Sequence, residues 1–484
     1  MRWANRALAR APRVRAIRYT GDMTVLRRMR VWLAIMGVRA LVGILRGLSR
    51  GGGALPGRVA LAIAPELLRD LARRLPRGVV MVTGTNGKTT SAHLLDEVLT
   101  EAGIQVVRNH SGANLASGLA TALALNRGAD VAVLETDEAT VPRVAAALAP
   151  TVMAVSNFFR DQLDRYGELT TTVGHVQRGL PHMARSGVAV LNADDPNVTS
   201  LAASAARVVY FGLTGTGRPA PANGADGADA RRCPACGGAL AYQVYQYAHL
   251  GSYACAACGF HRPPLDLAVA VHSHPAGQEL EMDWHGERWR VPLSLPGTYN
   301  AYNAALAAAA ALTLGVAPAS VASGLARAGA SFGRMEALVW RGVDVRVALV
   351  KNPTGFNQVL ETLADDPRPK DAVMLVNDRY ADGRDVSWLW DVDFEALLAG
   401  TGIDRIWTGG TRGRDMAVRL KYAGLPPDRV VAVPGPPAAV LAAAVDSAGE
   451  GAGRRLYVLP TYTALLAVRQ RLAAEGVVRH FREG

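Results

Sequence analysis

Short runs of consecutive apolar residues recur along the first part of the chain and predict buried strands. They contain no polar position, which is typical of parallel strands that are covered on both faces. Alanine-rich stretches that predict helices separate them. The alternating stretch at 289–295 and the run at 269–271 instead predict antiparallel strands. The fully apolar runs lie at 79–82, 131–134, 152–155 and 188–191.

A second series of apolar runs follows residue 332 and predicts a separate α/β unit, with strands near 345–350, 373–376, 406–407, 430–433 and 456–459. The predicted fold class is therefore α/β. We expect a domain over 55–331 built on a parallel sheet, with a helix at 64–74 and an alanine-rich helix at 303–314. The glycine- and proline-rich stretch 214–230 predicts a connector. A smaller Rossmann-like α/β domain is expected over 332–484.

The composition narrows the class of protein. Half of the 484 residues are hydrophobic and 19% are charged, which excludes a mainly disordered chain and a disulfide-stapled mini-protein. The net charge is +12, but residues 1–50 hold twelve arginines and one acidic residue, so the remaining 434 residues sum to only +1. Because the basic charge lies in an arm over residues 1–54 and not over a folded domain, we expect no nucleic-acid partner.

The segment 23–50 mixes arginines with valine, leucine, isoleucine and tryptophan, and predicts an amphipathic helix. Two interpretations stay open: the helix lies on an anionic membrane surface, or it packs on its own domain. No run of 18 uncharged apolar residues exists, so a membrane-spanning helix is not expected. No signal peptide is recognised. We therefore expect a cytoplasmic protein, with the inner face of the membrane as the surface that this helix would bind.

The strongest chemical signal is T-G-T-N-G-K-T-T at residues 83–90, between an apolar strand and a predicted helix. Glycines let backbone N–H groups turn toward phosphate oxygens, Lys88 supplies a charge for the β/γ-phosphates, and the Thr89 hydroxyl can bind Mg²⁺. Val82 stands where the general loop pattern has glycine. A chance turn with a surface lysine is the alternative. The predicted ATP-binding residues of the loop are Gly84, Thr85, Asn86, Gly87, Lys88, Thr89 and Thr90.

This loop resembles the signature of the Mur ligase and folylpolyglutamate synthetase superfamily, and further elements follow in the family's order. Glu135, after a buried strand, resembles the family's Mg²⁺-binding glutamate; its alternative is an exposed loop acid. L-N-A-D-D at 191–195 resembles the element that contacts the nucleotide, through Asn192 and Asp194. P-G-T-Y-N-A-Y-N at 296–303 resembles the element whose asparagine, here Asn300, reads adenine, whereas Asn303 is interpreted as a helix cap. F-G-R-M-E at 332–336 resembles the link to the C-terminal domain.

Three further stretches resemble one branch of this superfamily, the MurT family. They are N-F-F-R-D-Q-L-D-R-Y-G-E at 157–168, K-N-P-T-G at 351–355, and N-D-R-Y-A-D-G-R-D-V-S-W at 377–388. Ordinary Mur ligases have histidine at the position of Gln162, and many use a carbamylated lysine, but no lysine lies between Lys88 and Lys351. The resemblance covers residues 35–475 and implies a Mur-ligase-like central domain followed by a MurT-type C-terminal domain.

All four cysteines form two C-x-x-C pairs, each followed by glycine. Such knuckles place four thiolates for a tetrahedral, structural Zn²⁺ in a ribbon-like insert at about 230–262. Two disulfides are the alternative, and the absence of an export signal disfavours them. His249 and His261 are interpreted as ordinary surface residues. The predicted zinc ligands are Cys233, Cys236, Cys255 and Cys258.

The resemblance implies a specific reaction. ATP would phosphorylate the α-carboxyl of D-glutamate in the lipid II stem peptide, and ammonia would attack the acyl phosphate to give D-isoglutamine. The ammonia implies a partner, a class-I glutamine amidotransferase similar to GatD, because every cysteine of this chain is assigned to zinc. Two alternatives remain: a ligase that adds an amino acid, and a nucleotide-binding scaffold without catalysis.

Asp378, Asp382 and Asp385 cluster where a strand of the C-terminal domain is expected to end. The resemblance implies that one of them completes the Cys–His pair of the partner, and Asp378, directly after the strand, is the predicted one. An aspartate in this role holds the histidine in the correct tautomer. Loop capping beside Gly383 is the alternative, and it is preferred for Asp382.

Overall fold

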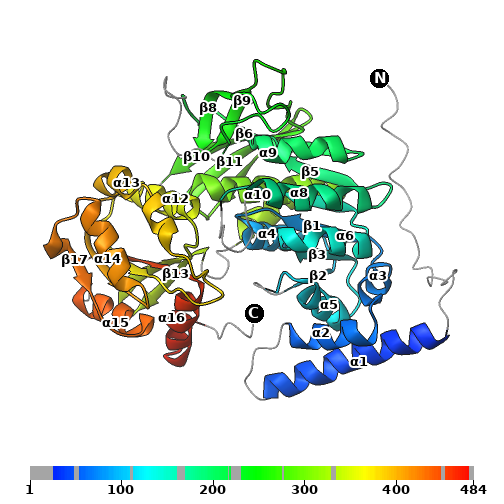
Figure 1. Ribbon diagram of the computed structural model, residues 1–484, viewed down its shortest axis with the longest axis horizontal. Coiled ribbons are helices and arrows are strands. Elements are labelled where there is room, and N and C mark those ends of the chain that lie inside the picture. Colours follow the sequence, from blue (N-terminus) through cyan, green and yellow to red (C-terminus); the bar gives the residue numbers. More distant parts are fainter. Residues whose placement is uncertain are drawn as a thin grey trace.

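The computed structural model describes residues 25–47, 54–109, 113–160, 169–215, 217–219, 230–274, 277–328, 334–448 and 453–478. It contains a large sheet, a second sheet in the C-terminal part and a small three-stranded sheet. The α/β fold class predicted from the sequence is confirmed. Figure 1 shows the C-terminal part, in yellow to red, beside the central part, with the small sheet at the top and the first helix at the bottom.

The central sheet has nine strands in the order β12-β11-β10-β6-β5-β4-β1-β3-β2. Strands β2 to β6 and β10 run parallel to β1, whereas β11 is antiparallel to both of its neighbours, β10 and β12. The alternating stretch thus forms an antiparallel strand as predicted, while the run 269–271, within β10, pairs antiparallel with β11 but parallel with β6. Because β1 lies between β3 and β4, its carboxyl end is a switch point, where α/β sheets bind ligands. The strands are β1 (Val79–Thr83), β2 (Val106–Arg108), β3 (Val131–Glu135), β4 (Val152–Val155), β5 (Val188–Asn192), β6 (Val208–Thr214), β10 (Leu267–His274), β11 (Gly277–Trp284) and β12 (Glu287–Leu293).

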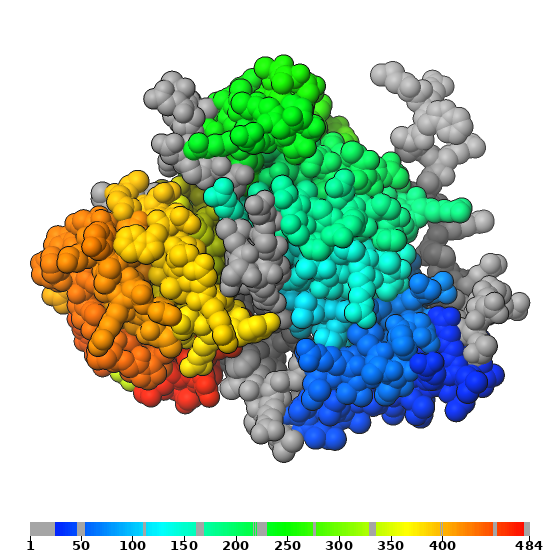
Figure 2. Space-filling model, viewed as in Figure 1, coloured from blue at the N-terminus to red at the C-terminus, as the bar shows by residue number. Residues whose placement is uncertain are grey.

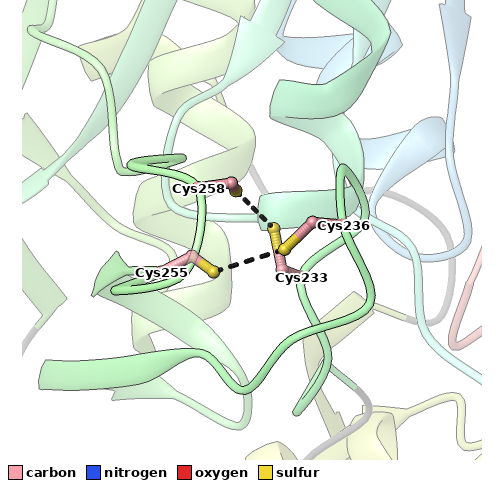
Figure 3. A group of neighbouring side chains, drawn as sticks. All are labelled: Cys233, Cys236, Cys255 and Cys258. Atoms are coloured by element: carbon pink, nitrogen blue, oxygen red, sulfur yellow. Dashed lines mark hydrogen bonds between the residues drawn. The ribbon is translucent and has the colours of Figure 1, made fainter.

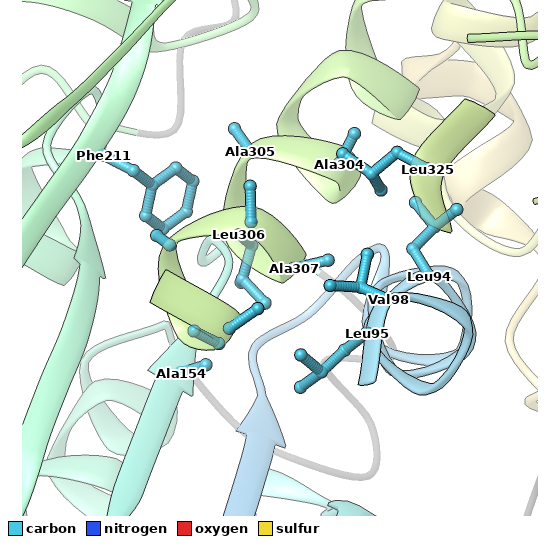
Figure 4. Packing of buried hydrophobic residues seen from close by; sticks show 14 of the residues in the cluster. Leu94, Leu95, Val98, Ala154, Phe211, Ala304, Ala305, Leu306, Ala307 and Leu325 are labelled. Carbon is cyan, nitrogen blue, oxygen red and sulfur yellow. The ribbon is translucent and has the colours of Figure 1, made fainter. Parts of the chain in front are cut away.

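Alternate residues of each apolar run pack on opposite faces of this sheet. Val80 and Val82 join one core, with α4, α10 and α11, whereas Val79 and Met81 join the other. In Figure 4, small alanines of α10 lie beside Leu94, Leu95 and Val98 of α4, which lets these two helices pack closely. The helices are α1 (Val25–Gly47), α2 (Leu55–Ile63), α3 (Leu67–Ala72), α4 (Lys88–Glu101), α5 (Ala116–Leu125), α6 (Val141–Leu148), α8 (Leu169–Gly179), α9 (Pro196–Ser200), α10 (Thr298–Thr313) and α11 (Pro318–Arg327).

The C-terminal sheet has six strands in the order β13-β14-β18-β15-β16-β17, and only the β13–β14 pair is antiparallel. Helices cover both of its faces. Its strands and helices are β13 (Arg334–Trp340), β14 (Val343–Ala348), α12 (Pro353–Ala364), β15 (Lys370–Leu375), α13 (Phe394–Thr401), β16 (Ile403–Gly409), α14 (Gly413–Tyr422), β17 (Val430–Ala432), α15 (Pro437–Ala448), β18 (Arg455–Pro460) and α16 (Tyr462–Ala474).

Three expectations about chain organisation need comment. The helix expected at 64–74 is α3, which is shorter than predicted, and a further helix, α2, precedes it across a turn between Ile63 and Leu67. The helix expected at 23–50 is α1, and no helix among the described residues is long and apolar enough to cross a membrane. Residues 1–24 of the basic arm, residues 161–168 of the Gln162 motif, residues 329–333 and most of the predicted connector lie outside the described residues.

Candidate functional site

The predicted phosphate-binding loop joins β1 to α4, as its sequence context requires. Gly84 has φ +118°, and a Cβ there would meet the Ser156 hydroxyl at 2.4 Å. Gly87, the residue before α4, has φ +87°, and a Cβ there would meet Asn303 Oδ1 at 2.0 Å. Both positions therefore require glycine. The first turn of α4 carries N–H groups that have no partner within the helix, and these favour an anion.

Residues after β4 fix the shape of this loop. The backbone N–H of Thr85 donates to the Asn157 carbonyl at 2.8 Å, and that of Asn86 donates to Asn157 Oδ1 at 2.9 Å. The Ser156 hydroxyl donates to the Asn86 carbonyl at 2.8 Å. Because β4 is the neighbour of β1, the sheet itself brings Ser156 and Asn157 under the loop. The loop is thus ordered by the protein before any ligand binds.

Lys88 extends over the loop and meets a carboxylate that sequence reasoning did not assign. Its Nζ lies 2.8 Å from Glu138 Oε1 and donates to the Gly84 carbonyl at 2.5 Å. Burial works to lower the pKa of Lys88, but the charge and hydrogen bond of Glu138, with smaller contributions from Glu135 and Asp137, outweigh it and raise the pKa. Lys88 is therefore held as a cation where the loop faces its ligand.

Thr89 and Glu135 lie side by side, as a shared metal site would need. The Thr89 hydroxyl donates to Glu135 Oε2 at 2.8 Å. Asn109 clamps the backbone of Glu135 from both sides: Glu135 N donates to Asn109 Oδ1 at 2.9 Å, and Asn109 Nδ2 donates to the Glu135 carbonyl at 3.0 Å. Hydroxyl and carboxylate oxygens are ligands that Mg²⁺ accepts. The donor set therefore fits Mg²⁺.

The C-terminal domain contacts the loop directly. Lys351 Nζ donates to the Thr85 carbonyl at 3.2 Å, and Asn352 Nδ2 donates to Asn86 Oδ1 at 3.0 Å. Asn352 also caps α12 by accepting from Gly355 N at 2.8 Å. The two residues lie in the K-N-P-T-G stretch, and the sequence alone does not assign either of them to the site. A cavity between the two domains is lined by residues of each domain, among them Gly87, Tyr247, Tyr299, Asn303, Lys351 and Gln358.

The two asparagines of α10 are not placed as the sequence predicted. Asn300 does not line this cavity; it is fully buried, and its Nδ2 donates to the Pro296 carbonyl at 2.8 Å. Asn303, interpreted from the sequence as a cap, lines the cavity beside Gly87. The N-cap of α10 is Gly297, so the cap interpretation of Asn303 is wrong. A residue in the second turn of α10 reaches the loop because this helix crosses α4.

Asn192 and Asp194 lie below the surface of the site, both with no exposed area. Asn192 Nδ2 donates to the Ser156 carbonyl at 2.9 Å. Asp194 accepts from Arg262 Nε and the Tyr302 hydroxyl, both at 2.5 Å. Burial raises the pKa of Asp194, and Arg262 opposes that shift. Both side chains are thus bonded to protein groups beneath the site, and their contact with the nucleotide stays a prediction.

The four cysteines converge at one end of the small sheet formed by β7 (Arg218–Pro219), β8 (Ala241–Tyr247) and β9 (Leu250–Ala254) (Figure 3). All four sulfurs lie within 4.8 Å of one another, and the Cys233–Cys258 and Cys236–Cys255 pairs are each 3.6 Å apart. A disulfide would need about 2.05 Å, whereas tetrahedral thiolates around a metal ion at about 2.3 Å lie near 3.8 Å from one another. The cluster can therefore bind a metal ion.

His249 is not the surface residue that was expected. It is fully buried, its Nε2 lies 3.3 Å from Asp195 Oδ2, and its ring lies edge-on to Phe159 with centroids 4.7 Å apart. The β8–β9 hairpin inserts Tyr247 and Leu250 into the central core, and His249 between them is carried inside. His261, by contrast, is exposed, as expected.

The three aspartates of the C-terminal domain have different surroundings. Asp382 is buried and accepts from the Thr463 backbone N–H at 2.7 Å, which is a loop-capping role. Asp385 is exposed and accepts from Ser387 N at 2.8 Å. Asp378 follows β15, its side chain is 26% exposed, and it accepts from the Thr411 hydroxyl and Arg412 Nε, each at 2.8 Å. These two hydrogen bonds lower its pKa, so it is a carboxylate at the surface.

Two family models match the chain. The Mur ligase middle domain matches residues 82–223, which include the loop and Glu135. The MurT ligase C-terminal domain matches residues 349–465, which include Lys351 and Asp378.

Named relatives cover nearly the whole chain. The lipid II isoglutaminyl synthase subunit MurT of Streptococcus pneumoniae is 34% identical, over 92% of this chain and 99% of its own length. Its counterpart in Staphylococcus aureus is 33% identical, over 82% of this chain and 88% of its own length. Among solved structures, the pseudomurein peptide ligase type C of Methanothermus fervidus has a TM-score of 0.63 at 22% identity, covering 85% of this chain and 81% of the ligase.

Proposed function

This chain belongs to the MurT family, and we propose that it is the ATP-using subunit of a lipid II isoglutaminyl synthase. The observation that carries the proposal is the arrangement of Lys88, Thr89 and Glu135 at the switch point, facing Lys351 of the MurT-type domain. The substrate is the α-carboxyl of D-glutamate in the lipid II stem peptide. The alternative, a ligase that adds an amino acid, has no support from a specific contact.

The first step transfers the γ-phosphoryl group of ATP to the substrate carboxylate. A carboxylate oxygen bonds to the γ-phosphorus, the bond to the ADP oxygen breaks, and an acyl phosphate results. Lys88 and the N–H groups at the start of α4 neutralise charge on the phosphates. Thr89 and Glu135 would hold Mg²⁺, which supplies further neutralisation of the phosphate oxygens. Asn303, in the cavity beside Gly87, is a candidate for contact with the adenine.

The second step forms the amide. The ammonia nitrogen bonds to the acyl carbon, the carbon–oxygen bond to phosphate breaks, and the nitrogen loses a proton. At neutral pH most ammonia is protonated to ammonium and little is present as NH₃. A source that releases ammonia at the site is therefore needed. This chain has four cysteines, all in the metal cluster, and hence none to serve as a glutaminase nucleophile. We therefore propose a heterodimer with a GatD-like class-I glutamine amidotransferase.

We propose that Asp378 serves that partner. It stands at the carboxyl edge of the C-terminal sheet, the edge from which Lys351 reaches the phosphate-binding loop. A glutaminase bound over Asp378 would release ammonia on the side of the sheet that faces the ATP site. Of the three aspartates, Asp382 is buried and already accepts two hydrogen bonds from Thr463, which favours Asp378 for contact with a partner.

The decisive test of the function is ATP turnover on lipid II with ammonium, with and without the glutaminase. We expect phosphate release and D-isoglutamine formation with ammonium alone, and with glutamine only when the glutaminase is present. Turnover that requires a free amino acid and proceeds without any partner would contradict the proposal and support the alternative ligase.

We further propose that the cysteine cluster holds one structural Zn²⁺. Four thiolates complete a tetrahedral shell and leave no position for a reacting water. The backbone supports the knuckles: Gly237 N donates to the Cys233 carbonyl at 2.8 Å, and Gly259 N donates to the Cys255 carbonyl at 2.9 Å. Because Arg262, just beyond the second knuckle, binds the buried Asp194, the cluster anchors the insert to the central domain.

Replacing Cys233 or Cys255 with serine should remove the zinc and lower stability without removing the chemistry. We expect a loss of about 2 kcal/mol or more, or about 5 °C in Tm, because metal binding is coupled to folding of such inserts. Metal analysis and thermal unfolding measure both effects. Ser252→Ala on β9, outside the cluster, is the control. A folded, active wild-type protein that contains no zinc would refute the assignment.

A further inference from the structure

Helix α1 has two apolar faces, and only one of them is covered by the part of the chain that the structure describes. Val31, Ala34 and Val38 are buried against the central domain. At 100° per residue, a second stripe falls on nearly the opposite side of the helix. Its large side chains are 43–74% exposed and are Val25, Leu26, Met29, Trp32, Leu33, Met36 and Ile44. The two interpretations offered by the sequence are therefore not exclusive: α1 packs on its own domain and still presents an apolar surface.

This outer stripe is unlike the rest of the described surface. Among the described residues, fifteen large apolar side chains are prominently exposed, and seven of them lie on α1 with two more, Leu55 and Val59, on α2. Isolated exposed apolar side chains are normal, whereas a continuous stripe of this kind marks an interaction site. Figure 1 places α1 along the lower border of the molecule, and Figure 2 shows it as part of the outer surface there.

Arginines border the stripe, and no acid interrupts it. On the helical wheel Arg30 lies on one side of the stripe, while Arg28 and Arg39 lie on the other. The 23 residues of α1 contain five arginines and no aspartate or glutamate. Arg27, on the covered side, donates to Asp70 at 3.1 Å and fixes the helix to the domain. The outer face is thus an apolar stripe bordered by Arg28 and Arg39 on one side and by Arg30 on the other, where Arg30 Nε also donates to the Ile63 carbonyl at 2.9 Å.

The charges indicate what covers this face. A second copy of the chain that packed on this face about a two-fold axis would bring the bordering arginines of the two copies close together. An anionic bilayer instead offers phosphates to the arginines and acyl chains to the stripe, and the interface region favours tryptophan, here Trp32. We propose that α1 binds in the plane of an anionic phospholipid membrane through this outer face, with its inner face holding the enzyme to it.

Vesicle flotation of the full chain tests this proposal. We expect binding to vesicles of phosphatidylglycerol mixed with phosphatidylcholine, and weak binding to phosphatidylcholine alone. The triple variant Met29→Gln, Trp32→Gln, Leu33→Gln keeps good helix formers and should lower partitioning by about 100-fold. Arg28→Gln and Arg39→Gln should each lower it about fivefold. Val418→Gln with Tyr422→Gln, exposed on α14, is the control and should leave binding unchanged.

Three results would overturn the proposal. The first is no binding to the anionic vesicles by a wild-type chain whose unfolding is cooperative. The second is equal binding of the triple variant and the control. The third is a wild-type dimer in lipid-free sedimentation that the triple variant loses, since a second copy would then cover the stripe. Because the readout is vesicle binding and not amidation, its failure would leave the proposed function in place.

Discussion

Lys88→Ala should abolish ATP-dependent amidation, with a fall of at least about 10³-fold in turnover. Lys88 is the only cationic residue within the T-G-T-N-G-K-T-T motif. Alanine at this position removes its positive charge from the transferring phosphoryl group. The variant also leaves Glu138, now 2.8 Å from Lys88 Nζ, as an unpaired buried carboxylate beside incoming phosphate. Both effects act against binding and transfer of the phosphoryl group.

The assay should supply ammonium and saturating ATP, so that the partner's glutaminase activity does not enter the result. Lys421→Ala, which removes an exposed lysine of α14, is the matched control and should retain wild-type turnover. Glu135→Gln should resemble Lys88→Ala, because it removes a carboxylate oxygen from the Thr89 pair. Full activity of Lys88→Ala would overturn the assignment of the loop.

The features that could be predicted from the sequence are those that a short segment determines by itself. The phosphate-binding loop is fixed by its own glycines between an apolar strand and a helix, and the structure places it there. The conformation of each C-x-x-C pair is likewise determined locally, since a backbone hydrogen bond within the motif closes each turn. The apolar runs predicted most strands because burial on both faces leaves a simple pattern.

What the sequence missed depends on contacts between distant segments. Glu138 is three residues beyond Glu135, but only the packing of its short helical turn brings it to Lys88. The spacing of Asn303 from Asn300 fits a helix start and predicts a cap, and only the packing of α10 against α4 places Asn303 beside Gly87. The chain has only four lysines, and this scarcity is the one sequence signal that points to Lys351.

The buried polar residues show a different limit. The sequence motif says nothing of the partners of Asp194, which are Arg262, at the far end of the insert, and Tyr302, on α10. His249 was expected at the surface because nothing in its neighbourhood signals burial. Its hairpin is inserted between Phe159 and Asp195, so its environment is decided by tertiary packing. Residue type and spacing along the chain therefore do not predict that such a side chain is buried.

Asp378→Asn should separate the two half-reactions of the complex. Amidation driven by glutamine should fall, by up to about 10⁴-fold, because the partner's histidine loses the carboxylate that orients it. Amidation driven by high ammonium should persist, because Lys88, Thr89 and Glu135 lie in the other domain. The two nitrogen sources are compared in one assay, with D-isoglutamine formation as the readout for both.

Asp446→Asn is the matched control, since Asp446 is likewise exposed and paired with an arginine, Arg341, at 2.7 Å. It should leave both activities unchanged. Loss of both activities in Asp378→Asn would assign Asp378 to the ATP site, and loss of neither would make it a surface residue held by Arg412. If Asp385→Asn shows the separation while Asp378→Asn does not, the partner's histidine is oriented by the other exposed aspartate of this loop. The buried Asp382, whose carboxylate holds the start of α16 through Thr463, should lose stability when changed, and its variants would not distinguish these roles.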